Sequence, residues 1–513
     1  MIYIPPPSKQ PPTPPSKQQQ PVPLPKEKPQ APPIHMLDQY KLDLNGLLID
    51  VRIYIREEDV VPTYNLSILN ISEITGIILN KIRDEFISRV NIGKVTFEES
   101  AGAEAIRGQF KEEIRLLIKK YFPKIDERTT EVLINYLITQ NIGLGNLDLL
   151  LKDGNLEEIV VNNSKEPVWV YHRKFGWLKT NVMIPKETRI RHYATMIGRD
   201  VGKEITMLKP LMDAYLKTGD RVNATLSPIS TKGNTMTIRK FAEKPWSITD
   251  FIKSNTISVE ASAWIWLAVQ NELSMLISGG TASGKTSALN AIANFFPPNH
   301  RILSLEDTRE LTLPNTLHWV PMETRLPNPE GKGEVTLLDL VVNSLRMRPD
   351  RIIVGEIRRK AEAEVLFEAM HTGHSVYATV HANSVSETIT RLTNPPIEIP
   401  KAMLGAVSLV VVQNRNRRTG LRRTFQVAEL LETGDYNVLM QLDMQKDQLV
   451  PVSQSMRLVN TLKLYTGLSP QDIRKSIEEK MEILRWMVKH NITDVHQIGV
   501  LVAKYYRGKL KLT

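Results

Sequence analysis

The chain has 513 residues, 42% of them hydrophobic and 24% charged, as expected for a globular protein of two to four domains. No apolar run approaches the roughly 18 residues that a membrane helix needs, and the start of the chain lacks the pattern of a signal peptide. The absence of cysteine excludes disulfides and thiolate metal sites and favours a cytoplasmic protein, while the net charge of +10 does not decide a partner. Frequent Ile, Lys and Arg also favour a hot habitat.

The first part of the chain is predicted as a disordered tail followed by an α/β and helical region. Residues 1–35 are rich in Pro, Gln, Lys and Ser, so they offer too little apolar surface to offset the entropy of ordering. The sequence leaves a docking role for this tail open. In the region 36–145, alternation predicts strands at Leu48–Ile55 and Thr63–Leu69. Helical spacing follows from Ser72 to about Val90 and from Glu98 to Gln140.

The next region, 146–244, is predicted as short strands around one helix, and residues 245–250 as a linker. Turn residues separate the strands, and the last two are expected to pair as a hairpin. The predicted strands are Glu157–Asn162, Val168–His172, Gly176–Asn181, Gly219–Pro228 and Asn234–Lys240, with a helix at Thr188–Asp200.

The remainder, 251–513, is predicted as an α/β domain with a parallel sheet. Short apolar strands alternate with helical patterns, which is typical of a sheet covered by helices on both faces. These strands are Ser274–Ser278, Arg301–Leu305, Arg351–Val354, Ser375–Val380 and Val407–Val412. A hairpin around Arg418–Leu421 and helices from Ser469 onward are expected to complete the domain.

A phosphate-binding loop follows the first strand of this domain. Residues 279–286 read G-x-x-x-x-G-K-T and stand between a predicted strand and a predicted helix, the context in which this motif binds nucleotide. Backbone N–H groups and the helix N-terminus favour an anion there, Lys285 can reach the β- and γ-phosphates, and Thr286 can bind Mg²⁺. The predicted ATP-binding residues are Gly279, Gly280, Thr281, Ala282, Ser283, Gly284, Lys285, Thr286 and Ser287.

Acidic residues follow two further strands of the predicted sheet. Glu306 and Asp307 come after one strand, and Glu356 comes just beyond another. Ligands bind at the carboxyl ends of strands in such sheets, so these acids are expected to face the phosphates. Gly355 stands where an Asp is often found, so Mg²⁺ is expected to depend on Thr286 and on Glu306 or Asp307.

Three histidines lie within residues 371–381. Zinc is a poor explanation, because no cysteine is present and the spacing splits across a helix end and a strand. Although a lone histidine is more often a buried structural residue, the neighbouring motifs favour a γ-phosphate contact for His374 and His381. We therefore predict that both line the nucleotide site.

These motifs, in this order, resemble those of the secretion ATPase superfamily, which serves type II secretion, type IV pili and archaella. The sequences of the segments Glu157–Asn162 and Val170–Trp177 resemble its archaeal branch. The resemblance implies a PAS-like domain ahead of a RecA-like ATPase domain. It also implies a homohexamer at the cytoplasmic face of the membrane, driving filament assembly through a polytopic platform protein. It gives Glu356 the place of the catalytic glutamate, with Lys285 and Glu306 beside it, and matches Arg221 and Arg239 to arginines that reach the nucleotide. Arg359 replaces a common Asp, which leaves the partner of Arg358 open.

Two other classes remain as alternatives to this ATP-driven motor. A nucleic-acid motor is favoured only by the basic composition, and aromatic residues interleaved with basic ones, which would stack bases, are not evident. A small-molecule kinase would leave about half of the chain without a role. The sequence does not say which filament the motor serves, nor whether it extends, retracts or rotates it.

Overall fold

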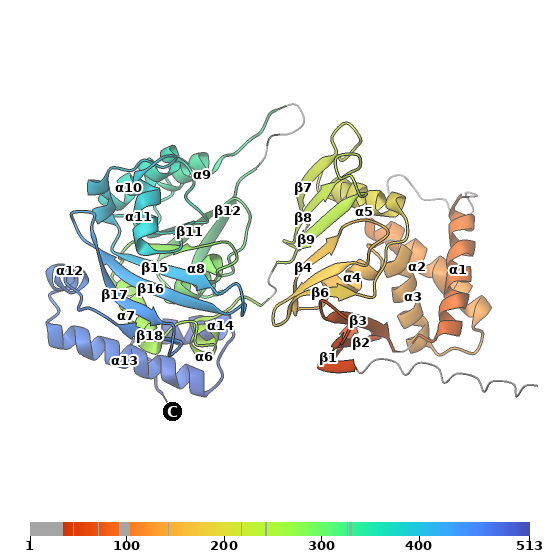
Figure 1. The fold of residues 1–513 in the computed structure, drawn as a ribbon, viewed down its shortest axis with the longest axis horizontal. Coiled ribbons are helices and arrows are strands. Elements are labelled where there is room, and N and C mark those ends of the chain that lie inside the picture. The colour runs from red at the N-terminus through yellow and green to blue at the C-terminus, as the bar shows by residue number, and fades with distance from the viewer. Residues whose placement is uncertain are drawn as a thin grey trace, which may run out of the picture.

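A computed structural model describes residues 34–512, except 45, 70, 92–102, 142, 217, 242–243, 326 and 328–330. The predicted tail, residues 1–35, therefore lies almost entirely outside the described part of the chain. The described residues form two nine-stranded sheets, which do not share a core, and a separate group of helices (Figure 1). The expected mixed α/β class is confirmed.

The first sheet combines strands from distant parts of the chain. Its order is β1-β2-β3-β6-β5-β4-β9-β8-β7, and every neighbouring pair is antiparallel except β3 and β6. The apolar faces of these strands pack against two helices. The elements are β1 (Ile34–Leu44), β2 (Leu47–Arg56), β3 (Thr63–Ile68), α4 (Asn146–Leu151), β4 (Leu156–Val161), β5 (Trp169–His172), β6 (Gly176–Thr180), α5 (Glu187–Asp200), β7 (Leu211–Tyr215), β8 (Arg221–Thr225) and β9 (Thr235–Arg239).

The sequence patterns missed β1 and β7, and they gave no sign that β3 would pair with β6. Because of this pairing, β1–β3 and the strands after residue 145 share one apolar core. Tyr40 of β1 and Tyr64 of β3 both donate hydrogen bonds to the buried Asp153, at 2.6 and 2.8 Å, and so fasten the first strands to the later ones. The predicted boundary at 145 stays a prediction.

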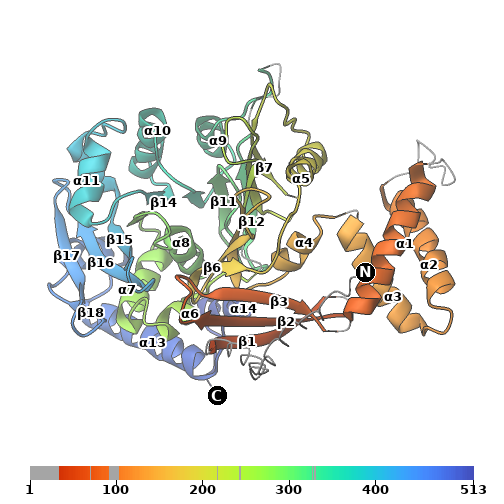
Figure 2. The ribbon, with the colours of Figure 1, turned by 45° about the vertical axis from the view of Figure 1, so that its right-hand side comes forward.

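Three helices, α1 (Glu73–Asn91), α2 (Ala103–Tyr121) and α3 (Glu127–Asn141), form a small core of their own beside this sheet (Figure 2). Their apolar faces meet as the helical spacing predicts. At the surface, Glu85 of α1 accepts hydrogen bonds from Arg89, Lys120 and Tyr121 at 2.7–2.8 Å and so connects α1 to α2.

The second sheet has the order β12-β11-β13-β14-β10-β15-β16-β17-β18. Neighbours from β12 to β15 are parallel, as predicted, and β15 to β18 are antiparallel. Strands β10, β13 and β14 are buried throughout, which explains their unbroken apolar sequences. The strands are β10 (Met275–Gly279), β11 (Arg301–Glu306), β12 (His318–Glu323), β13 (Arg351–Val354), β14 (Ser375–Val380), β15 (Leu409–Arg415), β16 (Arg422–Leu430), β17 (Tyr436–Asp443) and β18 (Gln448–Pro451).

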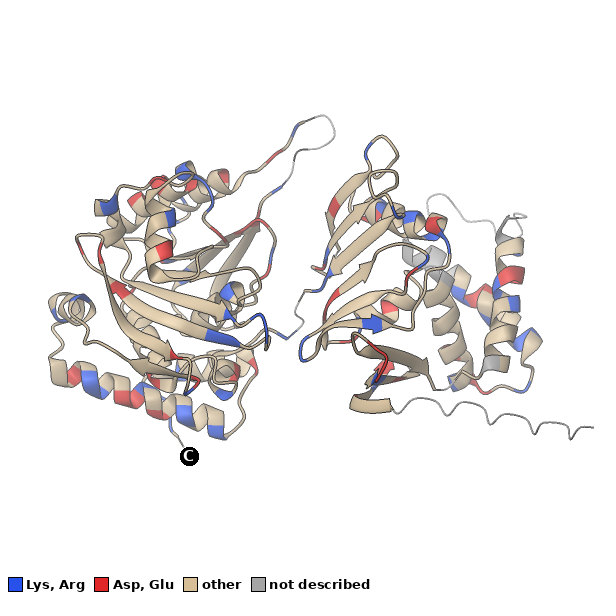
Figure 3. Cartoon of the chain, viewed as in Figure 1, with Lys and Arg blue, Asp and Glu red and all other residues tan. Residues whose placement is uncertain are grey.

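Helices cover both faces of the second sheet and give two cores, one on each side. Capping boxes begin α6 at Ser247, α9 at Thr336 and α13 at Ser469, where the side chain accepts a hydrogen bond from the third helical N–H. Acidic and basic residues alternate along α13 (Figure 3). The helices are α6 (Ile248–Lys253), α7 (Val259–Gln270), α8 (Lys285–Ala293), α9 (Leu337–Ser344), α10 (Lys360–His371), α11 (Val385–Thr393), α12 (Arg457–Thr466), α13 (Pro470–Lys489) and α14 (Val495–Tyr506), with a 3-10 turn at Lys401–Ala406.

Candidate nucleotide site

The predicted phosphate loop connects buried β10 to α8 at the centre of the second sheet. Gly284 precedes the helix with φ of 92°, a conformation that glycine adopts without strain. A β-carbon on Gly279 would lie 2.6 Å from the carbonyl oxygen of Gln413 on β15, so only glycine fits there. The loop therefore has the backbone shape that lets N–H groups surround an anion at a helix N-terminus.

Lys285, the first residue of α8, lies over this loop. Its ammonium donates hydrogen bonds to the carbonyl oxygens of Gly279 at 2.9 Å and Gly280 at 3.1 Å. Burial lowers the pKa of Lys285, and the negative charges of Glu356 and Glu310 act in the opposite direction. Lys285 is thus a partly buried cation with two carboxylates close to it.

Glu356 lies at the same edge of the sheet as the loop, because β13 runs parallel to β14 and β14 to β10. Its carboxylate accepts hydrogen bonds from Arg358 at 2.9 and 3.2 Å. The same guanidinium donates to Asp307, which follows β11, at 2.8 Å. Arg358 therefore has two acidic partners, Glu356 and Asp307. The sequence had left its partner open, because Arg359 stands where an Asp is common.

Glu306 is the last residue of β11 and is only 2% exposed. One carboxylate oxygen accepts hydrogen bonds from the N–H groups of Glu310 and Leu311 at 2.9 and 3.1 Å. The other oxygen is buried without a hydrogen-bond partner among the residues that the structure describes. Burial raises the pKa of Glu306 to about 7 in spite of the two backbone bonds. The side chain can therefore change its protonation state near neutral pH.

The structure separates the two predicted histidines. His381 follows β14 at the edge that holds the phosphate loop, whereas His374 precedes β14 at the opposite edge. The six residues of β14 span roughly 20 Å at 3.3 Å per residue. The side chain of His374 instead contacts Ala369 and Thr372 at the end of α10. This placement corrects the expectation of a γ-phosphate contact for His374 and leaves His381 as the candidate.

The residues predicted to bind Mg²⁺ are spread over the site. In the described ranges, no group of three or more His, Cys, Asp or Glu side chains is arranged to hold a metal. Thr286 lies in the first turn of α8, Glu306 has one unpartnered oxygen, and Asp307 is paired with Arg358. Because Mg²⁺ usually takes one or two protein ligands together with phosphate oxygens, this dispersed set fits a nucleotide-bound ion.

A row of polar and aromatic side chains crosses the first sheet on one face. Residues paired across neighbouring strands point to the same side, so the pairings place six side chains together. They are Trp177, Tyr171, Glu158, Arg239, Arg221 and Tyr215, from β6 to β7. The spacing of these residues in the sequence gave no indication of this row.

The row faces the nucleotide loop of the same chain. The Tyr215 hydroxyl is hydrogen-bonded to Thr308, and Tyr171 to Arg415 of β15. Arg239 is close enough to Lys285 for its charge to help burial lower the pKa of that lysine. Arg221 is held by two hydrogen bonds that its guanidinium donates to the carboxylate of Asp213, at 2.7 and 3.0 Å. The structure thus brings Arg239 toward the predicted site from a separate sheet and leaves Arg221 paired.

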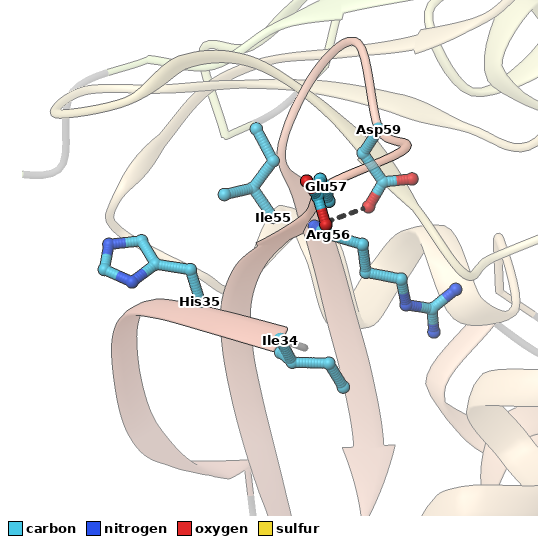
Figure 4. A pocket seen from close by; sticks show the side chains of 6 residues that line it. All are labelled: Ile34, His35, Ile55, Arg56, Glu57 and Asp59. Atoms are coloured by element: carbon cyan, nitrogen blue, oxygen red, sulfur yellow. Dashed lines mark hydrogen bonds between the residues drawn. The ribbon is translucent and has the colours of Figure 1, made fainter. Parts of the chain in front are cut away.

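A hollow elsewhere in the chain holds none of the predicted site residues. It lies where β1 begins and β2 ends and is lined by Ile34, His35, Ile55, Arg56, Glu57 and Asp59 (Figure 4). The backbone N–H of Arg56 donates to Asp59 at 3.0 Å there. The nucleotide site and this hollow are therefore separate.

A family model and several relatives match this chain. A model described as "Type II/IV secretion system protein" matches residues 211–426. An uncharacterized protein of Methanocaldococcus jannaschii is 34% identical over 442 residues, which cover 83% of this chain and 78% of that protein. A putative conjugal transfer protein of Mycobacterium tuberculosis is 32% identical over 317 residues, 59% of this chain and 89% of its own.

Among solved structures, the Legionella pneumophila ATPase DotB is 19% identical and has a TM-score of 0.39, with 72% of this chain and 92% of that chain covered. The sequence matches, rather than this structural likeness, carry the family assignment. None of the helices in the described ranges is both long and apolar enough to cross a membrane.

Proposed function

Because this chain belongs to the type II/IV secretion system protein family, we propose that it is a Mg²⁺-dependent ATP hydrolase that powers assembly of a type IV pilus-like or archaellum filament, or type II-like secretion. One observation carries the proposal. The Gly279–Thr286 loop lies at the same sheet edge as Glu356, which Arg358 holds in place. A loop that binds phosphates beside an oriented carboxylate is the arrangement that phosphoryl transfer to water requires.

The residues of this edge have separate roles in the proposed reaction. The Glu356 carboxylate accepts a hydrogen bond from the attacking water and so orients it, and Lys285 neutralises charge on the phosphates. Arg239 and Arg221 add cations from the first sheet, and His381 contacts the γ-phosphate.

Thr286 and Glu306 or Asp307 would hold Mg²⁺, which supplies charge neutralisation on the phosphate oxygens when bound. The fit rests on the Thr286 hydroxyl in the first turn of α8 and on the unpartnered oxygen of Glu306.

The proposed assembly is a homohexamer bound peripherally at the cytoplasmic face of the membrane, where it works on a polytopic platform protein. Residues 146–244 form a PAS-like domain in this proposal, and residues 251–513 form a RecA-like domain. The order of parallel strands around β10 and the relatives in Methanocaldococcus jannaschii support the fold and the archaeal assignment. Closure of the first sheet over the loop would convert binding energy into domain motion.

Phosphate release from ATP by the purified full chain tests the proposal. We expect turnover with Mg²⁺, loss of turnover with a chelator, and stimulation by anionic lipid vesicles rather than by DNA. No release of phosphate under any of these conditions would contradict the assignment as a hydrolase. Stimulation by DNA alone would favour a nucleic-acid motor instead.

A further inference from the structure

Arg422, the first residue of β16, contacts the phosphate loop through the loop backbone. Its Nε donates a hydrogen bond to the carbonyl oxygen of Ala282 at 3.0 Å. Ala282 has φ of 58°, a left-handed conformation that is unfavourable for a residue other than glycine. The side chain of Arg422 also passes the outer side of Gly284, where an added β-carbon would lie 3.7 Å from Cδ. Arg422 therefore supports the loop at Ala282, a residue with a left-handed backbone conformation.

The same guanidinium reaches the other sheet. Its Nη2 donates to the carboxylate of Glu157 on β4 at 3.3 Å, and the two side chains are 29% and 30% exposed. The register of β4 against β5 shifts between Leu156 and Glu158, so Glu157 is the extra residue of a β-bulge. A bulge redirects a side chain out of the regular alternation. Here it adds Glu157 beside the row that contains Glu158.

An arginine suits this position because its planar fork can bind two acceptors in fixed directions at once, whereas a lysine ammonium is a point charge. Arg415 stands opposite Arg422 in the β15–β16 hairpin and contacts Tyr171 of the first sheet. Each of these two arginines thus connects the β15–β16 hairpin to the first sheet. Among the hydrogen bonds of the described residues, Arg422 is the member of this pair that also binds the loop.

We propose that Arg422 is a positioning residue that couples the first sheet to the phosphate loop, so that loop order depends on the Glu157 contact. If the first sheet moved toward or away from the second, the Arg422 side chain would transmit this displacement to the backbone at Ala282. The consequence for nucleotide affinity rests on the proposed function, but the consequence for loop order does not.

The test compares Arg422→Ala, Glu157→Gln and the double variant of the full chain, with Arg423→Ala as the control. Arg423 is adjacent in sequence, but its guanidinium pairs with Asp447 at 2.6 and 2.7 Å. It also donates to the backbone carbonyl oxygens of Ser254 and Arg422, so this control removes contacts of β16 without removing the side chain that bonds to the loop. Hydrogen–deuterium exchange of the backbone amides of residues 279–286, without nucleotide, reports loop order. We expect faster exchange in Arg422→Ala, a smaller increase in Glu157→Gln, and none in Arg423→Ala.

Affinity for a non-hydrolysable ATP analogue is measured on the same four proteins. A charged hydrogen bond at partly exposed groups predicts an affinity about five- to twentyfold weaker for Arg422→Ala. The double variant should be no weaker than Arg422→Ala, because Glu157 acts through Arg422. Unchanged loop exchange in Arg422→Ala, or additive effects in the double variant, would overturn the proposal. If the unaltered chain binds no analogue, the proposed function fails, while the exchange data still decide the role of Arg422.

Discussion

Glu356 accepts a hydrogen bond from Arg358 at 2.9 Å, only two residues further along the chain. Arg358 also holds Asp307 at 2.8 Å, so the end of β13 is tied to the end of β11. The carboxylate proposed to orient water is therefore fixed in direction before any substrate arrives. A fixed carboxylate loses less entropy when it aligns a water molecule.

Replacement of Glu356 by Gln should keep nucleotide affinity near that of the parent and lower the rate of hydrolysis on the order of 10²-fold or more. The amide has the same shape but lacks the negative charge with which the carboxylate accepts the hydrogen bond from the attacking water. Analogue binding and phosphate release by the same protein separate the two effects. Turnover at the parent rate would exclude Glu356 from this role.

Lys285→Ala should abolish hydrolysis and weaken nucleotide binding, because the phosphates lose their cation in the loop. The variant also loses the two hydrogen bonds from the ammonium to the carbonyl groups of Gly279 and Gly280. Thermal unfolding should show that the protein is still folded, since both of these hydrogen bonds lie within the loop. A folded variant that hydrolyses ATP normally would contradict the assignment of the loop.

Arg239→Ala should lower hydrolysis more than nucleotide affinity, because a cation near the γ-phosphate matters most when negative charge develops in the transition state. Arg221→Ala should have a smaller effect, since Arg221 is paired with Asp213. Within one chain the positive charge of Arg239 already acts on Lys285, where it helps to lower the pKa of the lysine. Mixing Arg239→Ala with Lys285→Ala subunits should therefore restore no activity. Rescue in mixed oligomers would show instead that the arginine acts across a subunit interface.

Glu306→Gln should change how the free energy of unfolding depends on pH. The pKa of Glu306 is about 7 when folded and about 4.5 in its ordinary state, so the folded chain binds the extra proton between these values. Stability in the parent should accordingly fall as pH rises from about 4.5 to 7. The Gln variant lacks this decrease, and the exposed control Glu364→Gln keeps it. Denaturant unfolding at several pH values measures the difference, and parallel profiles for parent and Gln variant would refute the burial argument.

Glu85→Gln should destabilise the chain at neutral pH but not in strong acid. Hydrogen bonds from Lys120, Tyr121 and Arg89 lower the pKa of Glu85 to about 2. The stabilisation is thus present above about pH 4.5 and is lost as pH falls through about 2. Circular dichroism during unfolding, with Glu112→Gln as an exposed control, follows this difference. A gap between parent and variant that persists at pH 2 would contradict the prediction.

The sequence by itself determined the phosphate loop and the parallel sheet around it. The conformation of an eight-residue loop between a strand and a helix depends mainly on its own residues. The positions of glycine, lysine and threonine in the sequence therefore suffice to predict it. The buried strands β10, β13 and β14 could also be predicted, because strands that are buried on both faces have unbroken apolar sequences. The family resemblance rested on this loop and on the motifs at the ends of the strands, together with Glu157–Asn162 and Val170–Trp177 for the archaeal branch.

Only the tertiary structure decided which distant side chains meet. His374 and His381 are seven positions apart, but an extended strand between them places them at opposite edges of the sheet. Arg422 and Arg423 are neighbours in the sequence, yet one reaches the phosphate loop and the other Asp447. The parallel pairing of β3 with β6 joins segments more than a hundred residues apart. Such contacts depend on strand order and register, which the spacing of residue types along the chain does not encode.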